Sequence, residues 1–167
     1  LVPYVEIPLQ GDPAPFIEAL ARHGGRAKAR TGGIAASAFP TAAEVARFIV
    51  SCTRANVPFK ATAGLHHPLR GEFRLSYEAG SPSGTMFGFL NVLLATALAR
   101  ARADEREVTA LLEEREPSAI RFTEHGVHWR GHAMPVDALR AARSAAVSFG
   151  SCSFREPVDD LTIMGLL

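Results

Sequence analysis

The stretch VPFKATAGLHHPLRG, residues 57–71, decides the expected fold, because it has the pattern of a short strand that ends in a small-residue turn. A lysine lies in the middle of the strand, and His66 and His67 follow the turn. A similar segment, KARTG at 28–32, precedes KATAG at 60–64 by 32 residues, about the length of one βα unit. The two segments contain both lysines of the chain, so the repeat predicts equivalent lysines on neighbouring parallel strands.

The sequence before this stretch completes a β-α-β-α-β order. Segments rich in β-forming residues predict strands over 3–9 and 26–31. The segments between the strands predict helices, the first capped by Asp12 and the second by Thr41 paired with Glu44. This order is typical of parallel strands joined by right-handed crossovers.

After the third strand, the sequence predicts several further elements. They are helices over 86–102, 104–114 and 135–145, a hairpin around His125 and Gly126, a core strand over 146–153, and a short helix with a capping box from Ser153 to Glu156. We therefore expect an α/β fold of parallel βα repeats of the TIM-barrel type, a partial or half barrel with an inserted helical pair and a small β-hairpin. No low-complexity linker interrupts the chain, which predicts a single domain over 1–167.

A half barrel has two open sheet edges, and open edges need a partner. The chain begins almost inside a strand and without an initiator Met, so we expect it to be the carboxyl-terminal part of a longer protein. Either a missing amino-terminal half or another copy of the chain is then expected to cover the edges. The partner prediction is therefore a homo-oligomer or association with that half.

Composition excludes several classes of partner and site. The net charge of +1 argues against nucleic acid and anionic membranes. The longest apolar run covers 14 residues from Met86 to Ala99, whereas a bilayer span needs about 20. Cys52 and Cys152 lie 100 positions apart without a metal-binding spacing. We expect no metal, no cofactor and no disulfide framework, and a reducing cytoplasm as the location.

Alternation along the strands predicts one polar face. Side chains of a strand alternate between faces, so the apolar residues can face the helices while the polar residues gather opposite them. The predicted polar set is Glu6, Lys28, Arg30, Lys60 and Thr62. Polar side chains near the carboxyl ends of parallel strands are typical of ligand sites. The alternative is a structural ion pair between Glu6 and one lysine that fastens two strands.

Three glycine-containing loops follow the core strands at 31–33, 63–67 and 150–153. Backbone N–H groups of such loops, next to a helix amino end, can bind an anion. The predicted anion-binding residues, with Lys28, Arg30 and Thr62, are Thr31, Gly32, Gly33, Gly64, Gly150, Ser151 and Ser153. The alternative is that these glycines only turn the chain.

Three blocks, PFKATAGLHHP, MFGFLNV and FGSCSFREPVDDL, resemble a family of uncharacterised bacterial proteins in which they recur. The resemblance runs from Lys28 to the end of the chain. Members of that family are longer at the amino end, which again implies a carboxyl-terminal part. The resemblance implies no reaction.

The segments AKARTGG and FKATAGL also resemble, more distantly, the paired lysine strands of class I aldolase barrels of the deoxyribose-phosphate type. In that family one strand lysine forms a Schiff base and a lysine on the next strand tunes it. The resemblance implies a lyase in which Lys60 is the nucleophile and Lys28 its neighbour. The acidic partner would be Glu6.

The residues themselves allow this chemistry. A Schiff-base lysine must be neutral part of the time, and a nearby cation favours the neutral form, whereas a carboxylate at similar distance opposes it. His66 and His67, just past the strand end, are the expected acid/base residues. The expected substrate is a small anionic metabolite, a carboxylate or phosphate ester. The competing hypothesis is a non-catalytic binding or oligomerisation module.

Several other polar residues have weaker functional interpretations. Adjacent histidines point apart on an extended chain, which argues against a metal site. The histidines of the expected hairpin are predicted to lie at the surface. Cys152 is a possible nucleophile at a helix amino end, although a small residue fits there for structural reasons alone. Asn91, polar in an apolar helix, is expected to cap a loop, and the alternative is that it lines the site.

Overall fold

The centre of the molecule is a parallel sheet of four strands. The computed structural model describes residues 2–167. The strand order is β1-β2-β3-β9, and every neighbouring pair is parallel. The bounds are β1 Tyr4–Glu6, β2 Arg26–Arg30, β3 Phe59–Thr62 and β9 Ala146–Phe149. The prediction of an α/β fold with a parallel sheet is therefore confirmed.

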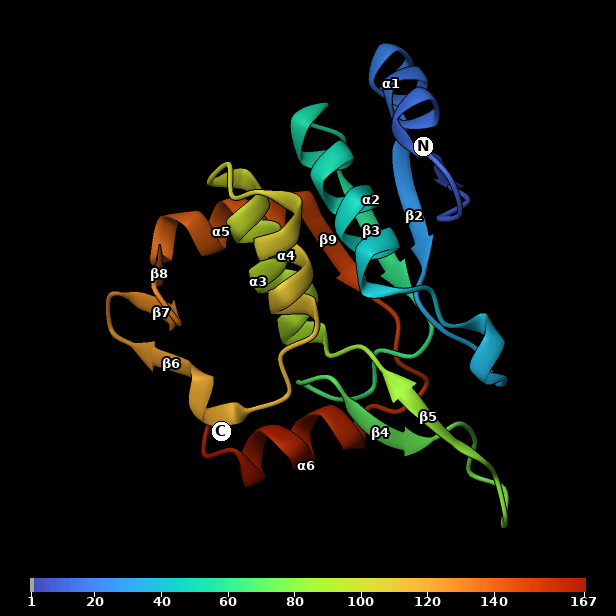
Figure 1. The fold of residues 1–167 in the computed structure, drawn as a ribbon, viewed down its shortest axis with the longest axis vertical. Coiled ribbons are helices and arrows are strands. Elements are labelled where there is room, and N and C mark those ends of the chain that lie inside the picture. The colour runs from blue at the N-terminus through green and yellow to red at the C-terminus, as the bar shows by residue number, and fades with distance from the viewer. Residues whose placement is uncertain (1) are drawn as a thin grey trace.

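Helices cover one face of this sheet (Figure 1). They are α1 Ala14–His23, α2 Ala42–Arg54, α3 Phe89–Arg100 and α5 Val136–Ala145, and α4 Glu105–Leu112 packs on α2 and α3. The small strand residues Ala27, Ala29 and Ala61 are at most 2% exposed beneath the helices, and Phe59 packs edge-on against Phe48 of α2. Val5 of β1 alternates onto the same face, yet it is 44% exposed because β1 is an edge strand.

Local signals set the helix ends. The predicted capping box between Thr41 and Glu44 opens α2 and is present in both directions. At α1 the predicted cap is displaced by one residue. Pro13 occupies the N-cap position, and Asp12 accepts a hydrogen bond of 3.0 Å from the N–H of Ala14. Gly24 ends α1 in the left-handed conformation, with φ of 65°, where glycine avoids the strain that a side chain would cause.

An antiparallel pair, β4 Gly71–Arg74 and β5 Ser83–Met86, forms an arm beyond the sheet. The sequence does not predict this arm. Because the segment up to Met86 is a strand, the apolar helix begins at Phe89 and not at Met86. Short 3-10 turns lie at Ala36–Ala38 and Pro117–Ala119.

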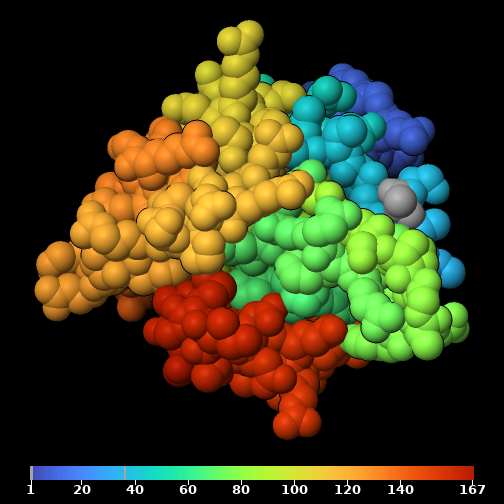
Figure 2. All heavy atoms as spheres, turned by 60° about the horizontal axis from the view of Figure 1, so that its bottom comes forward, coloured from blue at the N-terminus to red at the C-terminus, as the bar shows by residue number. Residues whose placement is uncertain are grey.

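The expected hairpin around His125 and Gly126 is confirmed, and a third strand extends it. Its strands are β6 Ile120–Thr123, β7 Gly126–Trp129 and β8 His132–Pro135. The last helix, α6 Arg155–Ile163, crosses below the arrowheads of the parallel strands (Figure 1). Figure 2 shows α6, in red, against the green segment that follows β3. Among residues 2–167, no helix has the length and apolar character that a membrane crossing requires.

Candidate functional site

The second face of the sheet exposes polar side chains. Lys28 and Lys60 are direct neighbours between β2 and β3, and Glu6 of β1 lies opposite Lys28. The Glu6 carboxylate lies 2.5 Å from Lys28 Nζ and 3.3 Å from Arg30 Nε. Hydrogen bonds from Lys28 and then Arg30 lower the pKa of Glu6. The expected ion pair between Glu6 and a lysine thus exists, and its lysine is Lys28. The pair is not buried, since the side chains are 25% and 43% exposed.

Lys60 has different surroundings. Its Nζ lies 4.3 Å from the centroid of the Tyr4 ring, a cation–π contact. Arg26 donates a hydrogen bond of 3.0 Å to the hydroxyl of the same tyrosine. No carboxylate within residues 2–167 forms an ion pair with Lys60. Lys60 is thus a half-buried amine beside an aromatic ring, on the open side of the sheet.

The loops after β2 and β3 pack against each other. Thr31 is buried and donates a hydrogen bond of 2.8 Å to the carbonyl of Ala63. A Cβ on Gly32 would lie 2.6 Å from the Phe39 ring and 3.0 Å from Gly64 Cα. Gly64 itself has φ of 72° and faces the same ring. Phe39 thus fills the space over both glycines, and their main role here is the close approach of two loops.

Three more of the expected anion-binding residues have simple structural roles. A Cβ on Gly33 would lie 2.8 Å from the Ala38 Cβ, so this glycine also accommodates its own loop. The Thr62 hydroxyl donates to the carbonyl of Ala29 at 3.2 Å, which ties β3 to β2. Gly150 donates its N–H to the carbonyl of Ala61 and continues β9 beside β3.

A compact cluster forms where the loops after β3 and β9 meet α6. His66 Nδ1 lies 3.2 Å from Ser151 Oγ and 3.3 Å from Glu156 Oε2. Cys152 Sγ lies 3.7 Å from both ring nitrogens of His66. The His66 side chain is 15% exposed, whereas Cys152 is exposed. A thiol, an imidazole and a carboxylate therefore lie next to one another in space, in that order, near the carboxyl ends of two parallel strands.

Tyr77, from the loop between β4 and β5, completes the cluster. Its hydroxyl donates a hydrogen bond of 2.9 Å to Glu156 Oε2 and lies 3.9 Å from Cys152 Sγ. Desolvation and the hydrogen bond to Glu156 raise the pKa of Tyr77 to about 12. Tyr77 as a whole is 69% exposed. The phenol stays protonated at neutral pH and can act as a donor.

The neighbouring His67 serves a different purpose. Its Nδ1 lies 2.6 Å from Asp160 Oδ2 of α6, and its ring stacks on Phe73 with centroids 3.4 Å apart. The two adjacent histidines therefore contact different partners. His67 fastens α6 and the β4-β5 arm to the end of β3, whereas His66 belongs to the cluster with Cys152.

The loop before α6 is held by its serines. Ser151 Oγ accepts from the N–H of Ser153 and donates to its carbonyl at 2.7 Å. The N–H of Glu156 donates to Ser153 Oγ, as the predicted capping box requires. The second half of the box is wrong, because the Glu156 carboxylate turns towards His66 and Tyr77. Phe154, and not Ser153, occupies the N-cap position.

The remaining candidates lie away from this cluster. Asn91 is buried, donates to the carbonyls of Leu111 and Glu114, and accepts from the N–H of Arg70 at 2.9 Å. The prediction that Asn91 caps a loop is confirmed. His125 is 86% exposed beside Glu124 on the hairpin. Within residues 2–167, no group of three or more His, Cys, Asp or Glu side chains is arranged to hold a metal.

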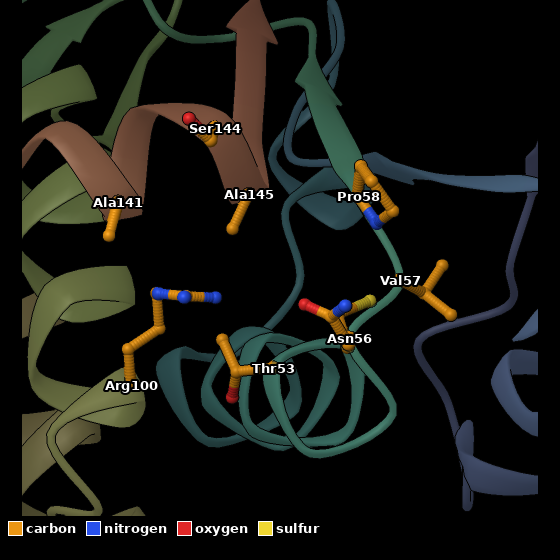
Figure 3. A pocket seen from close by; sticks show the side chains of 9 residues that line it. Thr53, Asn56, Val57, Pro58, Arg100, Ala141, Ser144 and Ala145 are labelled. Carbon is orange, nitrogen blue, oxygen red and sulfur yellow. The ribbon is translucent and has the colours of Figure 1, made fainter.

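A separate cavity of about 260 Å³ lies at the opposite, amino end of β3 and β9 (Figure 3). Pro58, Arg100 and Ala145 are among the residues that line it. Cys52, at its edge, is buried, and burial raises the pKa of its thiol. Ligand sites of parallel sheets lie at the carboxyl ends of the strands, so this cavity is not the candidate.

Sequence reasoning missed Tyr77 and Glu156 as members of the cluster, and it named Cys152 only as a possible nucleophile. Tyr77 lies in a Gly/Ser/Pro-rich loop with no local signal of function. Glu156 lies three residues after Ser153, the spacing of a capping box, so the sequence predicts a structural role for it and not a contact with His66. The signal for Cys152 was its place after a strand and before a helix. Comparison with family models, with curated proteins and with solved structures found no match to this chain.

Proposed function

We propose that the protein is an enzyme that acts on a small anionic metabolite, a carboxylate or phosphate ester, through the amine of Lys60. The reaction class is a lyase similar to class I aldolases. The observation that carries the proposal is the difference between the two lysines. Glu6 holds Lys28 in an ion pair, whereas Lys60 forms no ion pair with a carboxylate of residues 2–167 and lies over the Tyr4 ring.

The charge of the open sheet face supports an anionic ligand. Four cationic side chains and one carboxylate alternate onto this face from neighbouring strands: Arg26, Lys28, Arg30, Lys60 and Glu6. An excess of positive charge attracts anions and raises their local concentration. The net charge of the whole chain is only +1, so the excess is local.

The covalent step is imine formation. Lys60 Nζ, when neutral, attacks a carbonyl carbon, and loss of water gives the Schiff base. The carbonyl oxygen leaves as water after it takes up two protons, and the nitrogen gives up its two protons. His66, beyond the end of the same strand, is the acid/base candidate for these transfers. Lys28 and Arg30 are the proposed partners of the substrate's anionic group.

Borohydride trapping tests the proposal. The protein is incubated with a panel of 2-oxo acids and sugar phosphates, reduced, and analysed by peptide mass spectrometry. We expect a reduced adduct on Lys60, no adduct in Lys60→Arg, and a retained adduct in the matched control Lys28→Arg. No adduct from any panel member, or equal labelling of both lysines, would contradict the proposal. Anion binding without an adduct would instead favour the non-catalytic binding module.

We also propose that the parallel sheet is half of a barrel, which a second copy of the chain closes. The outer edges of β1 and β9 have no strand partner among residues 2–167. An apolar groove of about 410 Å³ follows the β9 edge, with Val147 41% and Phe149 47% exposed. Light scattering should give a dimer, and Val147→Lys should yield monomer because a lysine blocks edge pairing. A monomer at all concentrations would contradict this closure.

A further inference from the structure

The cluster of His66, Cys152, Glu156 and Tyr77 contains a second candidate nucleophile, the thiol of Cys152, which has no part in the reaction proposed at Lys60. Three segments far apart in the sequence supply it: the turn after β3, the loop after β9 with the first turn of α6, and the loop of the β4-β5 arm. The side chains enclose one side of a cavity of about 250 Å³.

The arrangement follows the order of a catalytic triad. Glu156 Oε2 lies 3.3 Å from His66 Nδ1, so a proton on Nδ1 points to the carboxylate and leaves Nε2 free to accept. Cys152 Sγ lies 3.7 Å from that Nε2. The sulfur is equally far from Nδ1, so a rotation of the ring is needed to align Nε2 with the thiol. Such contacts are often long before a substrate binds.

The carboxylate is fixed in place by a second donor. Tyr77 donates to the same Oε2 at 2.9 Å, which holds Glu156 towards the imidazole. Glu156 is one-third exposed and lies in the first turn of α6. Ser151 Oγ approaches Nδ1 at 3.2 Å and supports the same ring orientation. The imidazole therefore has an orienting group, as a general base beside a nucleophile requires.

The cavity walls indicate the kind of substrate. Ile34, Leu75 and Met86 provide an apolar surface, and Arg74 of β4 provides a cation. Arg74 forms no ion pair within the described part of the chain. A short acyl group with an anionic end matches both features.

We propose that Cys152 is a catalytic nucleophile, with His66 as its base, for transfer or hydrolysis of a short acyl group that carries a carboxylate. The thiol proton passes to His66 Nε2 as the sulfur attacks the acyl carbon. The leaving group takes that proton and departs, which leaves a thioester on Cys152. Water then attacks the thioester, its proton passes through His66 to the sulfur, and the free acid is released. The proposal stands independently of Lys60.

Two activated esters test the site, 4-nitrophenyl acetate and the mono-4-nitrophenyl ester of glutaric acid. We expect a burst of nitrophenolate and a thioester on the Cys152 peptide, both absent in Cys152→Ala. Removal of a general base costs about 10²- to 10⁴-fold, so His66→Gln should slow acylation at least 100-fold. The matched control, His125→Gln on the exposed hairpin, should react at the wild-type rate.

Two further variants separate a built site from a merely exposed cysteine. Tyr77→Phe should slow acylation about 5-fold, because Glu156 loses its donor. Arg74→Gln should abolish the preference for the carboxylate ester over the acetate ester. The proposal fails if wild-type Cys152 reacts with iodoacetamide no faster than glutathione does. It also fails if His66→Gln, shown to be folded by circular dichroism, acylates at the wild-type rate.

Discussion

The open sheet face and the cluster after the strand ends bring reactive side chains together in different ways. On the sheet face, Lys28 and Lys60 are neighbours because two strands run in register. In the cluster, Cys152 and His66 meet because two loops and a helix fold over the strand ends. The first arrangement follows from local alternation, and the second depends on the tertiary fold.

This difference has physical consequences. The Glu6–Lys28 pair is partly exposed, and such pairs contribute little to stability and are screened by salt. The cluster is held by contacts of 3.2 to 3.7 Å around a histidine whose side chain is 15% exposed, so it is less sensitive to salt. We therefore expect the sheet face to act mainly through charge and the cluster mainly through geometry.

The test with the largest expected effect removes the two proposed nucleophiles, Lys60 and Cys152, one at a time and measures both adducts in each variant. Lys60→Arg should reduce borohydride trapping at least 100-fold and leave ester acylation unchanged. Cys152→Ala should do the reverse. Each substitution removes one nucleophile and preserves the other, so the expected losses exceed those from any change in binding. Peptide mass spectrometry measures both adducts in the same samples.

One outcome of this test would contradict the presence of two separate sites. If Cys152→Ala also removed the Lys60 adduct, both residues would serve one reaction centre. Ser148→Ala, on the solvent side of β9 beside Lys60, is the control for an unspecific change of the sheet face.

The composition of the sheet face could be predicted from the sequence, because the side chains of a strand alternate between its two faces with a period of two residues. Alternation placed Lys28 and Lys60 on one side of the sheet, and the repeat made them neighbours, as the register confirms. The same reasoning predicted an ion pair of Glu6 with a lysine without identifying which one. Only the cross-strand register, with Glu6 beside Lys28, makes that choice.

The cluster could be predicted only in part. His66 and Ser151 follow strands, so the general location of ligand sites in parallel sheets indicated them. Tyr77 reaches the site from an arm whose strands, such as GEFR, have weak β-forming patterns. Glu156 has the spacing of a capping box, so the sequence predicts that its carboxylate binds the backbone at the start of α6. Tertiary contacts instead bring this carboxylate to the imidazole of His66. Contacts between loops across 70 or more residues have no local signal in one sequence.

A second test perturbs the support of the strand-end loop. Asn91→Ala removes three hydrogen bonds to backbone groups of Arg70, Leu111 and Glu114. Each buried group left without a partner costs about 1–3 kcal/mol, so we expect the loss of three partners to lower the free energy of unfolding by about 3 kcal/mol or more. Urea unfolding measures this loss.

The same variant distinguishes the two regions. The Arg70 N–H lies four residues after His66, so acylation of Cys152 should fall more than trapping at Lys60 while the protein is still folded. Gln10→Ala, at an exposed position before α1, should change neither stability nor acylation. Equal losses at both sites would mean that Asn91 stabilises the whole molecule and not this loop.

The smallest expected effect is that of Glu6→Gln. The lowered pKa of Glu6 means that the stabilisation from its ion pairs is present at neutral pH and above the ordinary value of 4.5. It is lost as the pH falls through the lower pKa of the folded state. Because Glu6 is exposed, acidification should remove less than about 1 kcal/mol from the free energy of unfolding of the wild type through this residue. In Glu6→Gln this part of the acid dependence should be absent.

The charge change should appear more clearly in binding. Glu6→Gln removes the one carboxylate paired with Lys28 and Arg30, so phosphate should bind about 2- to 3-fold more tightly at pH 7, and added salt should erase the gain. Calorimetry measures the affinity, with Glu18→Gln on the exposed side of α1 as the control. Ester acylation at Cys152 should not change, because His66 is oriented by Glu156 and not by Glu6. A parallel change in acylation would show that the charge of the sheet face extends to the strand-end cluster.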